Sequence, residues 1–254
     1  MRHRPELDGL RGIAVLIVLA SHTGLAGYAG SAGQAGVTLF FVLSGFLITS
    51  LLVVELGRNG RVDLRAFYVR RALRLLPAMF ALLAVVALGY SLDAWPSRIA
   101  PPIENVPLSL LAVATYVPNW ASMSIDMGVL GHTWSLGVEE QFYLLWPISL
   151  LAGIRILGPR RVALLALAVA ILVTPWRVFL MQIEPQIRVI AGTDTHADAL
   201  LFGCVLALGH VPSSGGTSGL QPGVTQTAAP SFSRSPRVGF GSPPRSRPSE
   251  PWGR

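Results

Sequence analysis

Long apolar runs separated by polar stretches dominate the pattern of this chain. Six runs can be traced, at about 9–28, 37–56, 75–92, 135–153, 162–181 and 198–210. A helix needs roughly 20 apolar residues to cross the hydrocarbon core of a bilayer, and the first five runs approach that length. The sixth is too short to span, because its apolar stretch ends at Gly209 and Pro212 soon follows. The pattern predicts an all-α, polytopic membrane helix bundle of about six segments, the last of them incomplete.

The first run could also be taken for a secretory signal peptide, since Arg2 and Arg4 precede it and small residues follow it. Asp8 and Arg11 at its start, and the further runs after it, favour a helix that is retained in the mature protein.

Composition supports a membrane protein. The chain is 52% hydrophobic and 13% charged, whereas soluble domains carry about 25% charged residues. The net charge of +7 suggests a nucleic-acid binder at first sight. The basic residues are all arginines, however, and they concentrate in the tail and between the apolar runs, so we expect no nucleic-acid partner. The single cysteine, Cys204, lies in an apolar run, which excludes a disulfide framework.

The arginines also predict an orientation, because cytoplasmic loops of membrane proteins are enriched in Lys and Arg. An N-terminus in the cytoplasm places most of them inside: Arg2, Arg4, Arg58, Arg61, Arg65, Arg70, Arg71, Arg74, Arg155, Arg160 and Arg161. We therefore expect a multi-pass protein of the cytoplasmic membrane. The long outer connection, at about 93–134, ends in Trp120, His132 and Trp134, which suggests a lid or vestibule.

Residues 211–254 consist largely of Pro, Gly, Ser and Arg. Such a composition cannot bury enough apolar surface to fold, so this tail is predicted to be disordered. The expected organisation is a partial membrane domain over 1–210 and a disordered tail over 211–254. The sixth apolar run is too short to cross the bilayer, and this tail follows it directly. That arrangement indicates a truncation or frameshift after about residue 209. The alternative is a natural disordered cytoplasmic tail.

Arg11 and His22 are the first candidates for chemistry. They are eleven positions apart on one predicted helix, which is close to three turns at about 3.6 residues per turn, so they share a face roughly 16 Å apart along the axis. Ionisable groups in a membrane span are costly and by default mark a functional path. An imidazole titrates near neutral pH and can act as a general base. The alternative for His22 is a hydrogen bond to a neighbouring helix, and Asp8 can simply pair with Arg11.

Two further groups carry charge into the apolar runs. Arg71 and Arg74 share a helix face, and their guanidinium groups suit a phosphate; their alternative role is to hold the loop in the cytoplasm. Glu139 and Glu140 lie about 100° apart on a helix, so at most one of them is expected to point fully into a bundle. The alternative is that both glutamates lie in the lipid headgroup region, beside an aromatic belt that includes Trp134.

Ser44 precedes Gly45 in the second run, where small residues permit helices to approach closely. Packing is preferred there to a serine nucleophile. The chain has no Walker loop, GxGxxG, HExxH or paired CxxC motif, and its histidines have no ligand spacing, so no metal is expected.

Taken together, these stretches resemble the acyltransferase 3 family of integral membrane acyltransferases. The matching parts are 7–14, the Arg-x10-His of Arg11 and His22, 36–47, 67–74, 132–147 and 193–201. They follow the family's order and cover most of residues 6–205. His196 stands where many relatives have arginine, and no role is assigned to it.

The resemblance implies an enzyme that transfers an acyl group, commonly acetyl, from cytoplasmic acetyl-CoA to a hydroxyl of a cell-envelope or secreted glycan or a lipid-linked acceptor. Acyl-CoA would be a co-substrate, and no bound cofactor is expected. Arg11, His22 and Glu139 would be the catalytic residues, with Arg71 and Arg74 near the CoA phosphates. The residues assigned to substrate binding are Asp8, Ser44, Arg71, Arg74 and Trp134.

Two alternatives stay open at this stage. The family's membrane domain usually has more spans than this chain, so residues 1–210 are expected to insert without forming a competent enzyme. The chain could then be an inactive product of a disrupted gene. It could also be a transporter fragment in which Arg11 and His22 form a proton relay. The expected partners are acyl-CoA, the acceptor and the lipid bilayer, and a further partner domain is left unidentified.

Overall fold

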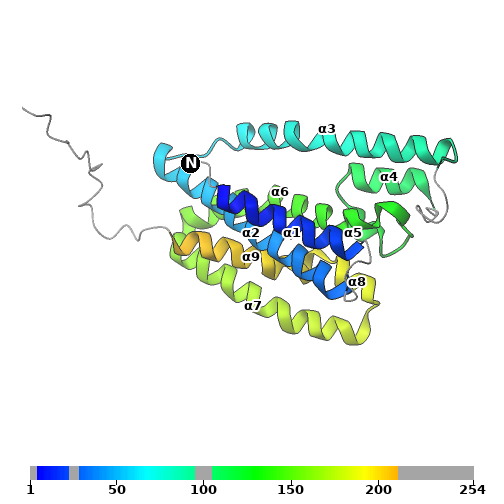
Figure 1. The fold of residues 1–254 in the computed structure, drawn as a ribbon. Coiled ribbons are helices and arrows are strands. Elements are labelled where there is room, and N and C mark those ends of the chain that lie inside the picture. The colour runs from blue at the N-terminus through cyan, green and yellow to red at the C-terminus, as the bar shows by residue number, and fades with distance from the viewer. Residues whose placement is uncertain (1–4, 23–28, 95–104, 211–254) are drawn as a thin grey trace, which may run out of the picture. The chain divides into compact units, whose positions relative to one another are not determined.

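The computed structural model describes residues 5–22, 29–94 and 105–210, with the side chains of residues 6–21, 32–94 and 105–210. The predicted tail at 211–254 lies outside the described residues. Helices make up the described chain, and no strand occurs within it. The elements, shown in Figure 1, are α1 (Pro5–His22), α2 (Ala29–Asn59), α3 (Leu64–Ser91), α4 (Val106–Ala114), α5 (Pro118–Ala121), the 3-10 helix η1 (Gly128–Thr133), α6 (Trp134–Leu157), α7 (Pro159–Ile183), α8 (Gln186–Ala191) and α9 (Thr193–Gly209).

The predicted all-α membrane bundle is confirmed. The six apolar runs correspond to α1, α2, α3, α6, α7 and α9. Four stretches are long and apolar enough to cross a membrane: Ala32–Asn59, Leu64–Ser91, Pro159–Ile183 and Gln186–Gly209. The sixth run is thereby longer than the sequence suggests, because α8 and the first turns of α9 extend it. Charged residues there interrupt the apolar pattern but are neutralised, as in the ion pair of Arg188 with Asp194.

Asparagine, aspartate and glycine residues fix where several helices begin. The Oδ1 of Asp63 accepts the Ala66 N–H at 2.9 Å at the start of α3, and the Oδ1 of Asn105 accepts the Leu108 N–H at 3.1 Å at the start of α4. Both are N-caps that satisfy an otherwise unpaired backbone donor. Gly158, with φ of 81°, permits the tight turn from α6 into α7.

The centre of the bundle is α2, which packs against α1 and α9, while α9 also packs against α7 (Figure 1). The α2–α9 crossing depends on two glycines. A Cβ added at Gly45 would collide with the Leu200 carbonyl oxygen, and one added at Gly203 would collide with the Val42 carbonyl oxygen. The two backbones are therefore in direct contact, as small residues allow in membrane helices.

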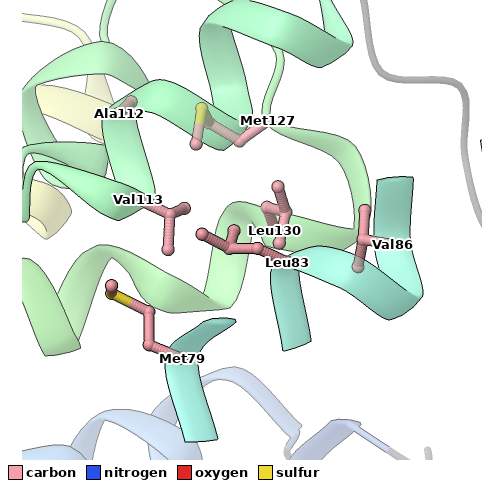
Figure 2. Packing of buried hydrophobic residues seen from close by; sticks show 7 residues of the cluster. All are labelled: Met79, Leu83, Val86, Ala112, Val113, Met127 and Leu130. Carbon is pink, nitrogen blue, oxygen red and sulfur yellow. The ribbon is translucent and has the colours of Figure 1, made fainter. Parts of the chain in front are cut away.

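The long connection between α3 and α6 contains folded structure in its described part. Figure 2 shows Ala112, Val113, Met127 and Leu130 facing the second half of α3. They form a cluster of buried residues with Met79, Leu83 and Val86. Residues 95–104, which also belong to the expected lid or vestibule, lie outside the described residues. The described remainder is thus a packed layer on α3.

Candidate active site

A buried serine joins three helices through side-chain hydrogen bonds. The Oγ of Ser44, on α2, is inaccessible to solvent and accepts a hydrogen bond from Nη2 of Arg11 on α1 at 3.2 Å. The same hydroxyl donates to Oε1 of Glu139 on α6 at 2.5 Å. We call Arg11, Ser44 and Glu139 the polar chain. A cation and a carboxylate are thereby linked by one hydroxyl inside a bundle of apolar helices.

The guanidinium of Arg11 has one N–H group left for a further hydrogen bond. Its Nε–H is buried and has no hydrogen-bond partner among the described residues. The centre of the group lies 5.6 Å from the centroid of the Phe40 ring. Leaving a buried N–H unpaired costs about 1–3 kcal/mol. This position is therefore suited to an oxygen atom from a ligand.

Glu140, the neighbour of Glu139, pairs with Arg71 on α3. The Nε of Arg71 donates to Oε2 of Glu140 at 2.9 Å, and its Nη2 donates to Oε1, which makes a bidentate ion pair. The guanidinium centre also lies 3.4 Å from the centroid of the Tyr143 ring. Glu139 is buried and Glu140 is only partly buried, which agrees with the expectation that at most one of the two points fully into the bundle. The two side chains lie on different sides of α6, one toward α2 and the other toward α3.

A pocket of about 490 Å³ lies beside this ion pair. Its walls come from α3, from the turn between α4 and α5, and from α6. The lining residues are Tyr68, Arg71, Ala72, Leu75, Leu76, Thr115, Tyr116, Val117, Glu140, Gln141, Tyr143 and Leu144. The volume is within the usual range for small-molecule sites, which are mostly apolar with a few placed polar groups.

Tyr116 enters the pocket from a strained backbone. Its φ of 58° is rare for a residue with a side chain. The amide of Gln141 holds it there, since Nε2 of Gln141 donates to the Tyr116 carbonyl oxygen at 2.9 Å. Burial raises the pKa of the Tyr116 phenol, and the negative charge of Glu140 raises it further. Strained residues cluster at functional sites, so this geometry marks the pocket as a candidate site.

Amide and hydroxyl groups connect α5, α6 and the start of α9. The Nε2 of Gln141 also donates to Oδ1 of Asn119 at 2.9 Å, and Nδ2 of Asn119 donates to Thr193 Oγ1 at 2.9 Å and to the Ala191 carbonyl oxygen at 3.2 Å. Thr193 Oγ1 completes the loop by donating to Oε1 of Gln141 at 2.6 Å. We call Asn119, Gln141 and Thr193 the amide hub.

Aromatic and charged residues hold the start of α9 against the bundle. Arg188 pairs with both carboxylate oxygens of Asp194 at 2.8 Å, and the Trp176 indole N–H donates to Asp194 at 2.7 Å. The His196 ring centroid lies 5.1 Å from that of Trp134 and 5.9 Å from that of Phe41. These contacts are satisfied within the protein and make a structural role sufficient for His196.

Comparison with known proteins identifies the bundle. A family model described as an acyltransferase domain matches residues 4–211, which includes every described helix. The chain belongs to the acyltransferase 3 family. Together with its apolar helices, this membership makes it a multi-pass membrane protein.

Relatives in the acyltransferase 3 family are O-acetyltransferases by name. The peptidoglycan O-acetyltransferase OatA of Listeria monocytogenes is 36% identical over 218 residues, which is 81% of this chain and 34% of that protein. The O-acetyltransferase OatA of Staphylococcus aureus is 37% identical over 215 residues, again 81% of this chain and 34% of that protein. The chain thus spans about a third of the length of these relatives. No solved structure matches the chain.

The structure brings together some of the residues that the family motifs select and separates others. Arg11, Ser44 and Glu139 meet in the polar chain. Arg74 is exposed, although it is one turn from Arg71, which faces α6. A role for Arg71 and Arg74 at the CoA phosphates stays a prediction.

The remaining predicted residues lie at the edges of the described site. Asp8 is on the exposed surface of α1, and Trp134 begins α6 against His196. His22 is the last residue of α1, and its side chain lies outside the described residues. Its shared face with Arg11 therefore stays a prediction.

Sequence reasoning did not select Tyr143 or Gln141. Both follow Glu139 and Glu140 within six residues, so a run of polar and aromatic residues interrupting an apolar helix was the available signal. Among the described residues, no group of three or more His, Cys, Asp and Glu side chains could hold a metal ion.

Proposed function

We propose that this chain carries the membrane acyl-transfer part of an O-acyltransferase, which moves an acetyl group from cytoplasmic acyl-CoA to a hydroxyl of a cell-envelope glycan. Its family membership and the names of its relatives support this class of reaction. The observation that carries the proposal is the unpartnered, buried Nε–H of Arg11 beside the Ser44–Glu139 hydrogen bond.

The polar chain holds Arg11 ready for an acyl donor. Because the Ser44 hydroxyl donates its hydrogen to Glu139, its lone pair is turned to the guanidinium. Glu139 therefore acts as a positioning residue through Ser44. The free Nε–H can then donate a hydrogen bond to an oxygen of the acyl donor. A hydrogen-bond donor that is already in position stabilises developing charge more strongly in a site that excludes water.

His22 is our candidate for the general base. It follows Arg11 by eleven residues on α1, a distance of about 16 Å at 1.5 Å per residue. An extended donor such as acyl-CoA can lie along that length, with Arg11 holding its arm and His22 at the thioester. The acceptor oxygen attacks the thioester carbon as its proton passes to the His22 imidazole. The carbon–sulfur bond then breaks, and the proton passes on to the departing CoA sulfur.

The arginine-rich connections support an orientation in the plasma membrane with the N-terminus on the cytoplasmic side. Arg11 would then lie toward the cytoplasmic end of α1, where the donor is made, and His22 toward the outer end, where a glycan acceptor lies. With the donor held at Arg11 and the reaction at His22, at the other end of α1, one site would serve substrates from both sides of the membrane.

The test is acyl transfer by the purified chain in proteoliposomes, with radiolabelled acetyl-CoA and a peptidoglycan-derived acceptor. We expect His22→Ala and Arg11→Ala to lower kcat at least about 100-fold. Glu139→Gln keeps a hydrogen-bond acceptor for Ser44 but removes the charge, and we expect a loss of about 10-fold.

Glu6→Gln is the matched control for Glu139→Gln. It removes the same charge from an exposed position on α1 and should leave the rate unchanged. Full activity in the His22→Ala and Arg11→Ala variants would overturn the proposed mechanism. Absence of acetyl transfer in the wild-type chain, with proton flux across the vesicles, would favour a proton relay instead.

A further inference from the structure

Tyr143 is a tyrosine at a position where packing alone would be served by phenylalanine. It lies on α6, one turn after Glu139, and is 3% exposed. Its ring belongs to a cluster of buried apolar side chains from several helices, among them Ile48, Leu52, Phe67 and Leu150. A buried phenol hydroxyl is costly unless it finds a hydrogen-bond partner. The reason for a tyrosine therefore lies at the tip of the side chain.

The tip of the Tyr143 side chain reaches the polar chain. Its hydroxyl is within hydrogen-bonding range of the Ser44 hydroxyl and of the Glu139 carboxyl group. Ser44 already donates its single hydrogen to Glu139 at 2.5 Å and accepts a hydrogen bond from Nη2 of Arg11 at 3.2 Å. A hydroxyl has one hydrogen to donate and two lone pairs, so Ser44 can accept one more hydrogen bond. Tyr143 is placed to donate it.

The ring of Tyr143 is held from its face by Arg71. The guanidinium centre lies 3.4 Å from the ring centroid, and the same guanidinium is fixed by its ion pair with Glu140. A cation over the face of an aromatic ring is attracted to it, so tilting the ring would lose this contact as well as the packing around it. The phenol oxygen therefore has a defined position beside Ser44.

A third hydrogen bond to Ser44 determines how its hydroxyl is turned. With one lone pair taken by Arg11 and the other by Tyr143, the Ser44 hydrogen points to Glu139 and the hydroxyl has no second orientation. Without the phenol, the hydroxyl can rotate and present either lone pair to the guanidinium. The Nε–H of Arg11, which has no hydrogen-bond partner in the part of the chain that the structure describes, would then no longer keep one direction.

We propose that Tyr143 is a positioning residue: it donates a hydrogen bond to Ser44 and thereby fixes the direction in which the Arg11 Nε–H points. Tyr143 acts through Ser44 and does not itself touch the reacting atoms. The consequence for acyl transfer rests on the proposed function, whereas the ordering of the Arg11 side chain does not. The two can therefore be tested separately.

The first test follows the Arg11 Nε–H by NMR, in the purified chain in nanodiscs with ¹⁵N-labelled arginine. Its resonance is the one that disappears in Arg11→Lys. We expect Tyr143→Phe, which keeps the ring and its packing, to speed the exchange of this hydrogen with water at least about threefold. Tyr90→Phe is the matched control, because it removes a phenol hydroxyl near the far end of α3 and should leave the exchange unchanged. Replacement of Tyr143 by 4-aminophenylalanine restores an N–H donor at the same place and should slow the exchange again.

The second test uses kinetics to separate positioning from a structural role. In the proteoliposome assay, Tyr143→Phe should lower kcat about 10-fold and leave the KM for acetyl-CoA unchanged, since one hydrogen bond that orders a charged group is lost. In a Ser44→Ala background the same substitution should have no further effect, because Tyr143 acts through Ser44. Tyr90→Phe should change neither constant.

Two results would overturn the proposal directly. One is unchanged exchange of the Arg11 Nε–H in Tyr143→Phe, and the other is a double variant in which the effects of Tyr143→Phe and Ser44→Ala multiply. A higher KM with unchanged kcat would also overturn it and would assign Tyr143 to substrate binding. Because the exchange measurement needs no acyl transfer, it decides the role of Tyr143 even if the wild-type chain transfers no acetyl group and the proposed function fails.

Discussion

Glu139 and Glu140 are adjacent in the chain but bind different helices: Glu139 accepts the Ser44 hydroxyl of α2, and Glu140 pairs with Arg71 of α3. One turn of α6 thereby connects two functional regions, the polar chain and the pocket. The consequence is that substitutions at these two positions should separate catalysis from the attachment of α3.

Glu140→Gln should loosen α3 without abolishing the polar chain. The substitution leaves the Arg71 guanidinium with a neutral partner in a largely buried position, and removing one member of a buried pair costs about 3 kcal/mol. Thermal unfolding in detergent measures the loss. Arg70→Gln, which removes a charge from the exposed side of α3, should not change the midpoint. An unchanged midpoint in Glu140→Gln would show that the ion pair does not hold α3.

Ser44→Ala should reduce acyl transfer while leaving the protein folded. The substitution removes the hydroxyl that links Arg11 to Glu139, and we expect a fall in kcat of about 10- to 100-fold, equivalent to about 1.4–2.7 kcal/mol at 1.36 kcal/mol per tenfold. Steady-state kinetics separate kcat from KM. Ser149→Ala is the comparison, since Ser149 is exposed and bonds within its own helix. A change confined to KM would contradict a role in positioning Arg11.

Gly45→Ala should separate α2 from α9. The added Cβ has no room beside the Leu200 carbonyl oxygen, and overpacking of this kind costs about 1–3 kcal/mol or more. The folded fraction after purification, followed by size-exclusion chromatography, reports the effect. Gly57→Ala, in the same helix with no atom near the added carbon, should instead stabilise the chain by up to about 1 kcal/mol. Equal behaviour of the two variants would argue against the close crossing.

Asn119→Ala should release the turn that carries Tyr116. Three hydrogen bonds of the amide hub depend on this fully buried amide, and unpaired buried groups cost about 1–3 kcal/mol each. Hydrogen exchange should become faster over residues 115–121 and 189–193. Asn59→Ala, at an exposed position, is the control. Unchanged exchange in Asn119→Ala would show that packing alone holds this turn.

The sequence was sufficient to predict the long helices, because continuous apolar runs of about 20 residues have few other stable forms in a membrane. It was insufficient for α4, whose nine residues are too few to span and were included in a long loop. The packing of that segment on Met79 and Leu83 depends on contacts far apart in the chain, which periodicity does not contain.

The sequence selected some residues of the candidate site but not the contacts between them. Arg11, Ser44 and Glu139 were selected from motifs, yet the hydrogen bonds through Ser44 follow from how α1, α2 and α6 cross. Arg71 was expected with Arg74 at a phosphate, from spacing within one helix. Its bond to Glu140, 69 positions away in sequence, required the fold.

The two glycines of the α2–α9 crossing have a consequence for the depth of the whole site. Because backbone meets backbone at Gly45 and Gly203, a slide of one helix along the other would bring side chains into the contact. Ser44 is the residue before Gly45, so the α2–α9 backbone contact fixes its position along the axis of the bundle. The position of the Arg11 guanidinium, which hydrogen-bonds Ser44, thus depends on two residues that have no side chain, Gly45 and Gly203.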